Sequence, residues 1–317
     1  MLYRCSFCRR QSDSTSPEFS TGRCPHCGEE LAGEFSGGRI GEFTVLAELG
    51  RGNNGVVYLA RQQILNREVA LKILPPERFE EPATRQAFFR ESKVTAKLSH
   101  PNIVQAWAAG VTEHGYGFFA MELVAGKSLD DWLLAFGALT YAEALKIGAR
   151  ISDALAYAWE KYGMTHGDIK PGNIIIRQSD KCPKLADLGL AKFANEPYQD
   201  EVMATPLYAP PEVINFDFEH MGYKSDIYSF GATLYELFAG EAPFPSDDQQ
   251  WVLDQHRFTV PEPLKERGCF DPQLSDFIAS MLAKNPDDRP EWRDIADFLQ
   301  QLERRLPHAQ PAVTSAF

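Results

Sequence analysis

The stretch His166-Gly167-Asp168-Ile169-Lys170-Pro171-Gly172-Asn173, followed by Asp187-Leu188-Gly189, is the most informative part of this 317-residue chain. Each of its polar residues is common in loops, but their order and spacing are not. The combination is typical of sites that transfer a phosphoryl group from ATP. One carboxylate orients the attacking hydroxyl, one ammonium offsets charge, and an amide oxygen and a second carboxylate hold Mg²⁺. We therefore expect Asp168 and Lys170 to be catalytic, and Asn173 and Asp187 to ligate magnesium.

A glycine-rich run, Gly50-Arg51-Gly52-Asn53-Asn54-Gly55-Val56-Val57, lies upstream between strand-like residues 43–49 and 56–60. Glycines let backbone N–H groups approach phosphate oxygens closely. Similar runs occur in dinucleotide sites, where a helix follows the glycines. Because a second strand-like segment follows here, we expect a strand–loop–strand hairpin over a nucleotide.

Val69-Ala70-Leu71-Lys72 comes about one strand later. A Lys at the end of an apolar strand is commonly solvated, but Lys72 has the spacing of a lysine that contacts the α- and β-phosphates. Such a lysine needs an acidic partner. Glu91 opens a helical pattern and is our candidate. Glu80 and Glu81 are alternatives, but they precede Pro82 and suggest a loop.

Further motifs follow in the same order as in one known family. They are His100-Pro101-Asn102-Ile103-Val104, Met121-Glu122-Leu123-Val124, Thr205-Pro206-Leu207-Tyr208-Ala209-Pro210-Pro211-Glu212, Ser225-Asp226-Ile227-Tyr228-Ser229-Phe230-Gly231 and Asp287-Asp288-Arg289-Pro290. With the motifs above, residues 42–306 resemble the protein kinase family. The resemblance implies a bilobal α+β fold, with a β-rich small lobe at 42–122 and a helical large lobe at 126–306.

The resemblance also implies roles for single residues. Lys72 would hold the ATP phosphates and pair with Glu91. Met121 would be the gatekeeper, and the backbone of Glu122 and Val124 would bind adenine. The remaining nucleotide-binding positions would be Gly50, Gly52, Gly55, Val57, Ala70, Asn173 and Asp187.

Other positions would be structural or would define the substrate. Asp226, Glu212 and Arg289 would be buried charges that need partners, and Arg289 would pair with Glu212. Lys170 two places after Asp168, with Thr205 near the end of the activation segment, resembles a Ser/Thr kinase rather than a Tyr kinase. The implied substrate is a protein with a Ser or Thr acceptor.

The chain departs from the family pattern at three places. Gly167 stands where many kinases have an Arg that anchors a phosphorylated activation loop. Residues 190–204 also contain no Ser or Thr, and Tyr198 is their only hydroxyl. We therefore expect activity that does not depend on phosphorylation of this loop. Leu188 for Phe and Pro210 for Ala remove no catalytic group.

Two alternatives to a protein kinase remain. A pseudokinase adaptor would usually lack the Lys, the catalytic Asp or the metal-binding Asp, and this chain has all three. Small-molecule kinases share the core fold, but the peptide-positioning segment 205–212 argues against them.

The first 34 residues predict a separate module. Cys5-x₂-Cys8 and Cys24-x₂-Cys27 have ribbon-like spacing, which favours a structural Zn²⁺ site. Disulfides and a rubredoxin-like iron site are alternatives. The module has four Arg, no Lys and five acidic residues, so it lacks the clustered positive charge that nucleic-acid binding needs. We expect a zinc ribbon that serves as a protein-interaction or regulatory module.

The remaining features concern the whole chain. Its net charge is −12, which argues against non-specific nucleic-acid binding. No window of ~18 apolar residues predicts a membrane span, and the N-terminus lacks an apolar signal region, so we expect a cytoplasmic protein. We interpret residues 35–41 as a flexible linker and 307–317 as a disordered tail.

Overall fold

The computed structural model describes residues 2–4, 11–13, 26, 38–52, 55–187, 192–193, 205–268 and 271–306. The chain divides into two units, one of Met1–Ser99 with Val104–Ala125 and the other of His100–Ile103 with Gly126–Phe317. The expected zinc ligands, Tyr198 and the expected tail lie outside the described residues. Within the described part of the chain, no helix is long and apolar enough to cross a membrane.

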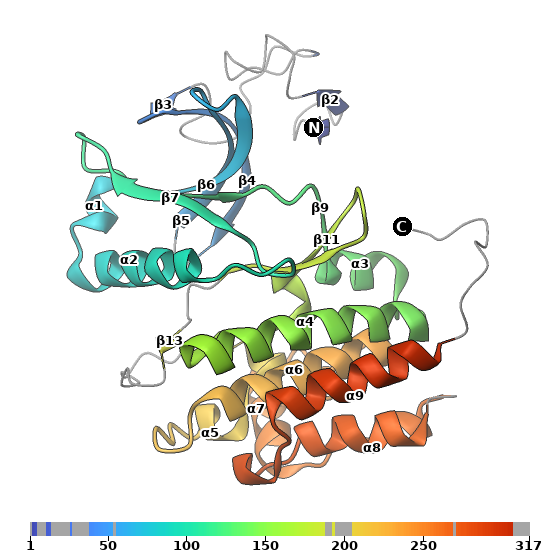
Figure 1. Cartoon of the computed structure of the whole chain (residues 1–317). Helices are drawn as coiled ribbons and strands as arrows, with labels where there is room; N and C mark the ends of the chain where they lie inside the picture. The colour runs from blue at the N-terminus through green and yellow to red at the C-terminus, as the bar shows by residue number, and fades with distance from the viewer. Residues whose placement is uncertain are drawn as a thin grey trace. The chain divides into compact units, whose positions relative to one another are not determined.

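The first unit is built on an antiparallel sheet with the strand order β3-β4-β5-β6-β8-β7 (Figure 1). Its strands are β3 Arg39–Ile40, β4 Phe43–Gly52, β5 Gly55–Gln62, β6 Arg67–Leu74, β7 Ala106–Val111 and β8 Gly117–Glu122. Two helices accompany the sheet, α1 Pro76–Phe79 and α2 Pro82–Lys97. This is the β-rich small lobe that the sequence predicts.

The two faces of this sheet pack into different clusters because successive strand residues point to opposite sides. On one face Val69, Leu71 and Ile73 of β6 join a buried core. On the other face Leu74 and Phe119 pack with Phe79 of α1 and Phe88 of α2. Helix α2 therefore covers the face that carries the even-numbered residues of β6.

Strand β3 lies within the segment that we expect to be a linker. Arg39 pairs with Thr44, and Ile40 pairs with Phe43. Ile40 is 4% exposed and belongs to the buried core of the sheet. Its burial explains why the end of this segment is ordered as a strand.

A short hairpin lies near the N-terminus. Strand β1, Leu2–Arg4, pairs antiparallel with β2, Gln11–Asp13, so that Arg4 is opposite Gln11. In the sequence, Cys5 and Cys8 fall between these two strands.

The second unit is mainly helical. Its helices are α3 Leu129–Phe136, α4 Tyr141–Tyr162, α5 Pro211–Ile214, α6 Tyr223–Ala239, α7 Gln249–Phe258, α8 Pro272–Met281 and α9 Trp292–Arg305. In the sequence, Leu145, Ile151, Leu155 and Trp159 recur near helical spacing and predict a helix over 141–162, which are the bounds of α4. Thr140 and Glu143 form a capping box at its start, and Gly163 ends it at a φ of 58°.

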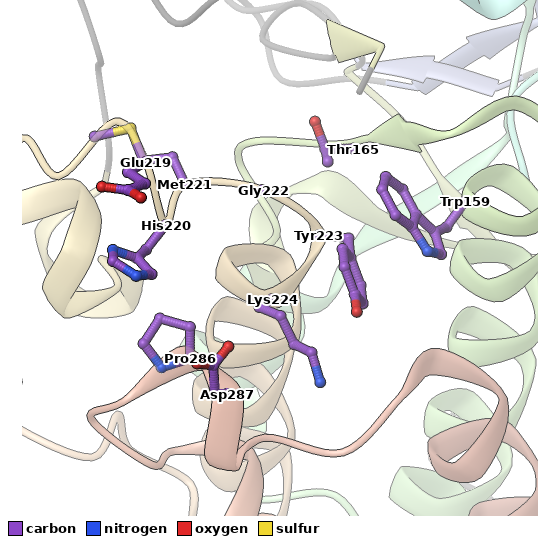
Figure 2. A pocket seen from close by; sticks show the side chains of 10 residues that line it. All are labelled: Trp159, Thr165, Glu219, His220, Met221, Gly222, Tyr223, Lys224, Pro286 and Asp287. Atoms are coloured by element: carbon purple, nitrogen blue, oxygen red, sulfur yellow. The ribbon is translucent and has the colours of Figure 1, made fainter. Parts of the chain in front are cut away.

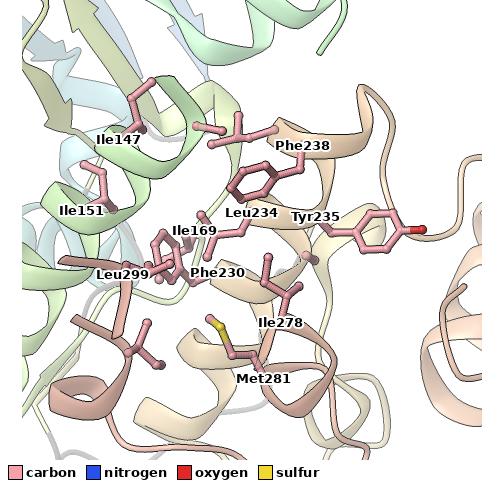
Figure 3. Packing of buried hydrophobic residues seen from close by; sticks show 14 of the residues in the cluster. Ile147, Ile151, Ile169, Phe230, Leu234, Tyr235, Phe238, Ile278, Met281 and Leu299 are labelled. Atoms are coloured by element: carbon pink, nitrogen blue, oxygen red, sulfur yellow. The ribbon is translucent and has the colours of Figure 1, made fainter. Parts of the chain in front are cut away.

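Helix α6 lies at the centre of the second core, and most of its residues are buried. Figure 3 shows its side chains meeting those of α4, α8 and α9. Two glycines let the helices approach closely. A Cβ at Gly148 would lie 2.8 Å from Leu234 Cδ2, and one at Gly231 would lie 2.9 Å from Met281 Cβ.

Short strands bracket the loop that carries Asp168. Strand β10, Met164–Thr165, precedes the loop and pairs with β13, Lys192–Phe193. Strand β11, Ile174–Arg177, follows the loop and lies between β9, Gly126–Ser128, and β12, Pro183–Leu185. The sequence predicts a mainly helical lobe here and does not predict these short strands.

Candidate active site

The loop 166–173 is anchored to α6 by Asp226. The backbone N–H of His166 donates to Asp226 Oδ2 at 2.6 Å, and that of Gly167 donates to Oδ1 at 2.8 Å. Asp226 is 4% exposed. Burial raises the pKa of its carboxyl group, while the His166 ring and the two amide donors act in the opposite direction. Asp226 is thus the buried, hydrogen-bonded charge that we expect.

His166 fixes the start of the loop from the other side. Its Nε2 lies 3.1 Å from the carbonyl oxygen of Ala186, and its Nδ1 lies 3.2 Å from the backbone nitrogen of Asp168. Since the carbonyl can only accept and the backbone N–H can only donate, Nε2 carries the proton. The ring therefore joins the Asp168 loop to the residue that precedes Asp187.

Asp168, Lys170, Asn173 and Thr205 form one cluster. Lys170 Nζ lies 2.6 Å from Asp168 Oδ2 and donates to Thr205 Oγ1 at 2.8 Å. The Thr205 hydroxyl donates to Asp168 Oδ1 at 2.9 Å. Asn173 Nδ2 donates to the carbonyl of Asp168 at 2.7 Å and to its Oδ2 at 3.1 Å. The Asp168 side chain is 15% exposed, so a constrained carboxylate remains accessible to a substrate.

The contact of Thr205 with Asp168 is a functional feature that the sequence reasoning misses. From the sequence, Thr205 is interpreted only as a feature that resembles a Ser/Thr kinase. The two residues are 37 positions apart, so no local pattern connects them.

The β11–β12 hairpin brings the two expected magnesium ligands to the same end of a ladder. Ile174 pairs with Leu185, and just beyond this pair the N–H of Ala186 donates to the carbonyl of Asn173 at 2.8 Å. Asn173 points its Nδ2 at the Asp168 carbonyl, which turns its Oδ1, a hard oxygen ligand, away from that carbonyl.

Two residues of this region have left-handed backbone conformations. Asp187 has a φ of 58° and Gly167 a φ of 84°. For a residue with a Cβ this region is sparsely populated and strained. Gly167 adopts it without that strain, so a glycine fits the local backbone at this position.

In the first unit, the strand register places four of the expected nucleotide-binding residues on one face of the sheet. Lys72 is opposite Val57 on β5 and Phe119 on β8. Ala70 is opposite Met121 and lies two residues from Lys72, hence on the same face. Lys72 is 6% exposed. Val57, Ala70, Lys72 and Met121 therefore share the face covered by α2.

Glu91 lies on α2 as the sequence predicts, but its side chain is outside the described residues, and its pairing with Lys72 stays a prediction. Phe88, three residues earlier, packs in the same cluster as Phe119. Because Phe119 is opposite Lys72, Phe88 of α2 packs on the face of the sheet that carries the lysine.

The glycine-rich residues form the predicted hairpin, with Gly52 opposite Gly55 across β4 and β5. A Cβ at Gly50 would meet no atom within 4 Å, so packing does not require glycine there. At the other end of the sheet, the Glu122 N–H donates to the Gln105 carbonyl at 2.8 Å. The expected contacts of Glu122 and Val124 with adenine stay predictions.

Arg289 and Glu212 form the buried ion pair that the sequence predicts. Their side chains are 0% and 3% exposed. Two parallel hydrogen bonds of 2.6 and 2.8 Å join the guanidinium to the carboxylate, and Ser225 donates to Glu212 Oε1 at 2.7 Å. Arg289 also donates to the Ala283 carbonyl, so both charges are well satisfied. Pro210 precedes α5 in extended backbone, and the Ala-to-Pro departure is accommodated there.

A pocket of about 290 Å³ lies at the N-terminal end of α6 (Figure 2). Trp159 stacks on Tyr223 at its edge, with ring centroids 4.2 Å apart. Lys224 also lines it and donates to the Arg289 carbonyl at 2.6 Å. The pocket contains no member of the Asp168 cluster, so it is separate from the candidate active site.

Within the described ranges, no group of three or more His, Cys, Asp or Glu side chains is arranged to hold a metal ion. Cys5, Cys8, Cys24 and Cys27 lie outside those ranges.

Comparison with known proteins agrees with this geometry. A family model described as a protein kinase domain matches residues 43–299. The chain is similar to the serine/threonine-protein kinase PknB of Mycolicibacterium smegmatis, with 34% identity over 281 residues. It is also similar to the serine/threonine-protein kinase PkaA of Streptomyces coelicolor, with 34% identity over 295 residues.

A probable serine/threonine-protein kinase of Clostridium perfringens, CPE1738, is 33% identical over 278 residues. The alignments cover 84%, 87% and 86% of this chain, but 44%, 53% and 39% of PknB, PkaA and CPE1738, respectively. The chain thus spans roughly two fifths to one half of the length of these relatives.

Proposed function

We propose that this chain, which belongs to the protein kinase family, transfers the γ-phosphoryl group of ATP to Ser and Thr hydroxyls of protein substrates. The observation that carries the proposal is the cluster around Asp168, in which Lys170, Asn173 and Thr205 all contact one carboxylate. A carboxylate held in this way is oriented before the acceptor arrives.

Each residue of this cluster has a different role. Asp168 accepts or orients the proton of the acceptor hydroxyl. Lys170, whose ammonium now contacts Asp168 and Thr205, is long enough to turn toward the moving phosphoryl group and offset its charge. Thr205 keeps Asp168 in place from the segment that precedes the acceptor-binding residues.

Each unit carries residues of the kinds that bind ATP or Mg²⁺. Asn173 Oδ1 and the Asp187 carboxylate would hold Mg²⁺, which supplies charge neutralisation at the phosphates when bound. The strained φ of 58° at Asp187 supports a functional role, because strain of this kind clusters at active sites. Lys72, paired with Glu91, would hold the phosphates beneath Gly50, Gly52 and Gly55.

We further propose that activity does not require phosphorylation of the activation loop. Gly167 offers no guanidinium to a phosphate, and its φ of 84° disfavours any side chain there. The protein is treated with phosphatase, assayed, and then rephosphorylated within residues 190–204. Unchanged activity after the phosphatase is expected. A large loss that rephosphorylation reverses would contradict the proposal.

The test of the main proposal is phosphoryl transfer itself. The wild-type protein and an Asp168→Asn variant are incubated with Mg²⁺ and ATP labelled in the γ-phosphate, together with a protein acceptor. We expect label on Ser and Thr of the acceptor with the wild type only. Equal labelling in both samples would remove the support for catalysis by this cluster and would favour a pseudokinase adaptor.

For residues 1–34 we propose a zinc ribbon that docks a protein partner in the cytoplasm. The pairing of β1 with β2 supports it, because these strands flank Cys5 and Cys8 in the sequence, as expected for one knuckle of a ribbon. Metal analysis should find one Zn²⁺ per chain, which Cys5→Ser abolishes. One iron per chain, or no metal in the wild type, would contradict this proposal.

A further inference from the structure

His256 of α7 is a buried histidine that the catalytic chemistry above does not use. It is 0% exposed, and both of its ring nitrogens are engaged. Nε2 lies 3.0 Å from the carbonyl oxygen of Leu207, and Nδ1 lies 2.9 Å from the hydroxyl of Tyr228. Phe244 packs edge-on against the ring, with centroids 5.0 Å apart.

The direction of each hydrogen bond follows from the partners. The Leu207 carbonyl can only accept, so Nε2 carries the proton and Nδ1 accepts from the Tyr228 hydroxyl. Lys284 Nζ donates to that hydroxyl at 3.2 Å and to the His256 carbonyl at 2.7 Å. A chain of hydrogen bonds therefore runs from Lys284 through Tyr228 and His256 to the Leu207 carbonyl.

The end of this line lies beside the active site. Leu207 belongs to the 3₁₀ turn Pro206–Tyr208, which begins directly after Thr205. Thr205 contacts both Asp168 and Lys170. The next carbonyl of the turn, that of Tyr208, accepts from Ser229 of α6 at 2.9 Å. Helices α6 and α7 thus hold consecutive carbonyls of the turn that leads into the catalytic cluster.

We propose that His256 is a positioning residue. By donating to the Leu207 carbonyl, it fixes the conformation of the turn 206–208, to which the acceptor polypeptide binds next to Asp168. The proposal rests on the kinase function proposed above and adds a residue to it. His256 does not touch the reacting atoms. Its role is to keep the backbone that follows Thr205 in one conformation.

The surroundings keep the ring in the neutral form that this role needs. Burial, with the charge of Lys284 as the next cause, lowers the pKa of His256 to about 4. The groups that face it are Tyr228 on α6 and Lys284 after α8. The Arg289 guanidinium lies over the Tyr228 ring, 4.9 Å from its centroid, and the charge of Glu212 also acts on Tyr228. Neutral His256 donates from Nε2 and accepts at Nδ1 across the ordinary range of pH.

The test compares His256→Leu, which removes the donor, with His256→Gln, which restores an N–H at similar reach. Val252→Ala is the matched control, because Val252 is a buried residue of the same helix, 1% exposed, whose side chain cannot donate to Leu207. Myelin basic protein is the acceptor. KM values for acceptor and for ATP, kcat and the unfolding temperature are measured for each protein.

We expect His256→Leu to lower kcat/KM for the acceptor about tenfold, the size of one lost hydrogen bond, mostly through KM. Its KM for ATP should not change, and His256→Gln should recover most of the loss. Val252→Ala should lower the unfolding temperature and leave the acceptor KM unchanged. Tyr228→Phe, which keeps the ring but removes one partner, should give a smaller effect in the same direction, and it supplies the test if the Leu variant does not fold.

Three results separate the explanations. No labelling of the acceptor by the wild type would contradict the proposed function itself. Equal acceptor KM values for wild type, His256→Leu and Tyr228→Phe, in an active enzyme, would contradict the positioning role alone. An acceptor KM that rises as much in Val252→Ala would also overturn it, because the effect would then come from the stability of α7.

Discussion

Asp226→Asn is the substitution for which the structure gives the clearest quantitative expectation. Asp226 uses both carboxylate oxygens, since Oδ2 accepts from the His166 N–H at 2.6 Å and Oδ1 from the Gly167 N–H at 2.8 Å. An Asn has one oxygen, so its amide nitrogen must face one of the two backbone donors. The loop that carries Asp168 then loses one of its two attachments to α6.

The size of the effect follows from the lost bond. A hydrogen bond to a charged group contributes about 1.5–3 kcal/mol, and a buried donor left without a partner costs about 1–3 kcal/mol. Removing the buried charge of Asp226 offsets part of this loss of free energy. A net loss of about 2–3 kcal/mol is expected. If the loss appears in the activation barrier, it lowers kcat about 30- to 150-fold.

The assay is steady-state phosphorylation of a protein acceptor, with urea unfolding measured on the same samples. Asp248→Asn is the matched control, because Asp248 is an N-cap of α7 that accepts from the Trp251 N–H at 3.1 Å, and Asn caps helices equally well. Wild-type kcat and wild-type stability in Asp226→Asn would refute the reasoning.

Three further predictions concern single sites. Gly167→Arg, at a φ of 84°, should lower the free energy of unfolding by about 1–2 kcal/mol without raising kcat; a gain in kcat on loop phosphorylation would contradict this. Arg289→Met leaves the Glu212 carboxylate buried, so urea unfolding should show a loss of about 3–5 kcal/mol, and adding Glu212→Gln should recover part of it. Because the pKa of His256 is lowered to about 4 from its usual 6.5, the unfolded chain binds a proton first as pH falls. Through His256, the free energy of unfolding should therefore fall by about 3 kcal/mol as the pH is lowered from 6.5 to 4. A wild-type acid unfolding profile in His256→Gln would oppose this.

Residues close in sequence or strongly patterned are predicted well from this chain. The glycine hairpin follows from strand-like residues on both sides of the glycines, and α4 follows from apolar residues that recur near helical spacing over 141–162. The buried pair of Glu212 and Arg289 is predicted because its two motifs have fixed partners in the family that the chain resembles.

The rest depends on contacts that no local pattern records. Strands β3, β10 and β13 have two residues each, which is too short for periodicity to show. Helix α7 is not predicted because Trp251 and Phe258 leave its apolar residues on more than one face, and both side chains are exposed. His256 is 49 positions from Leu207, so its contact arises only from packing of α7 against the turn.

The claim to be tested most directly is the proposal that Lys72 binds the phosphates of ATP and that Asp187 ligates Mg²⁺. The protein is treated with a lysine-reactive acyl phosphate of ATP, and labelling of Lys72 and its protection by ATP are measured with and without Mg²⁺. The account predicts strong, Mg²⁺-dependent protection in the wild type that is lost in Asp187→Asn. Protection that is the same in both proteins, or no labelling of Lys72 at all, would contradict it.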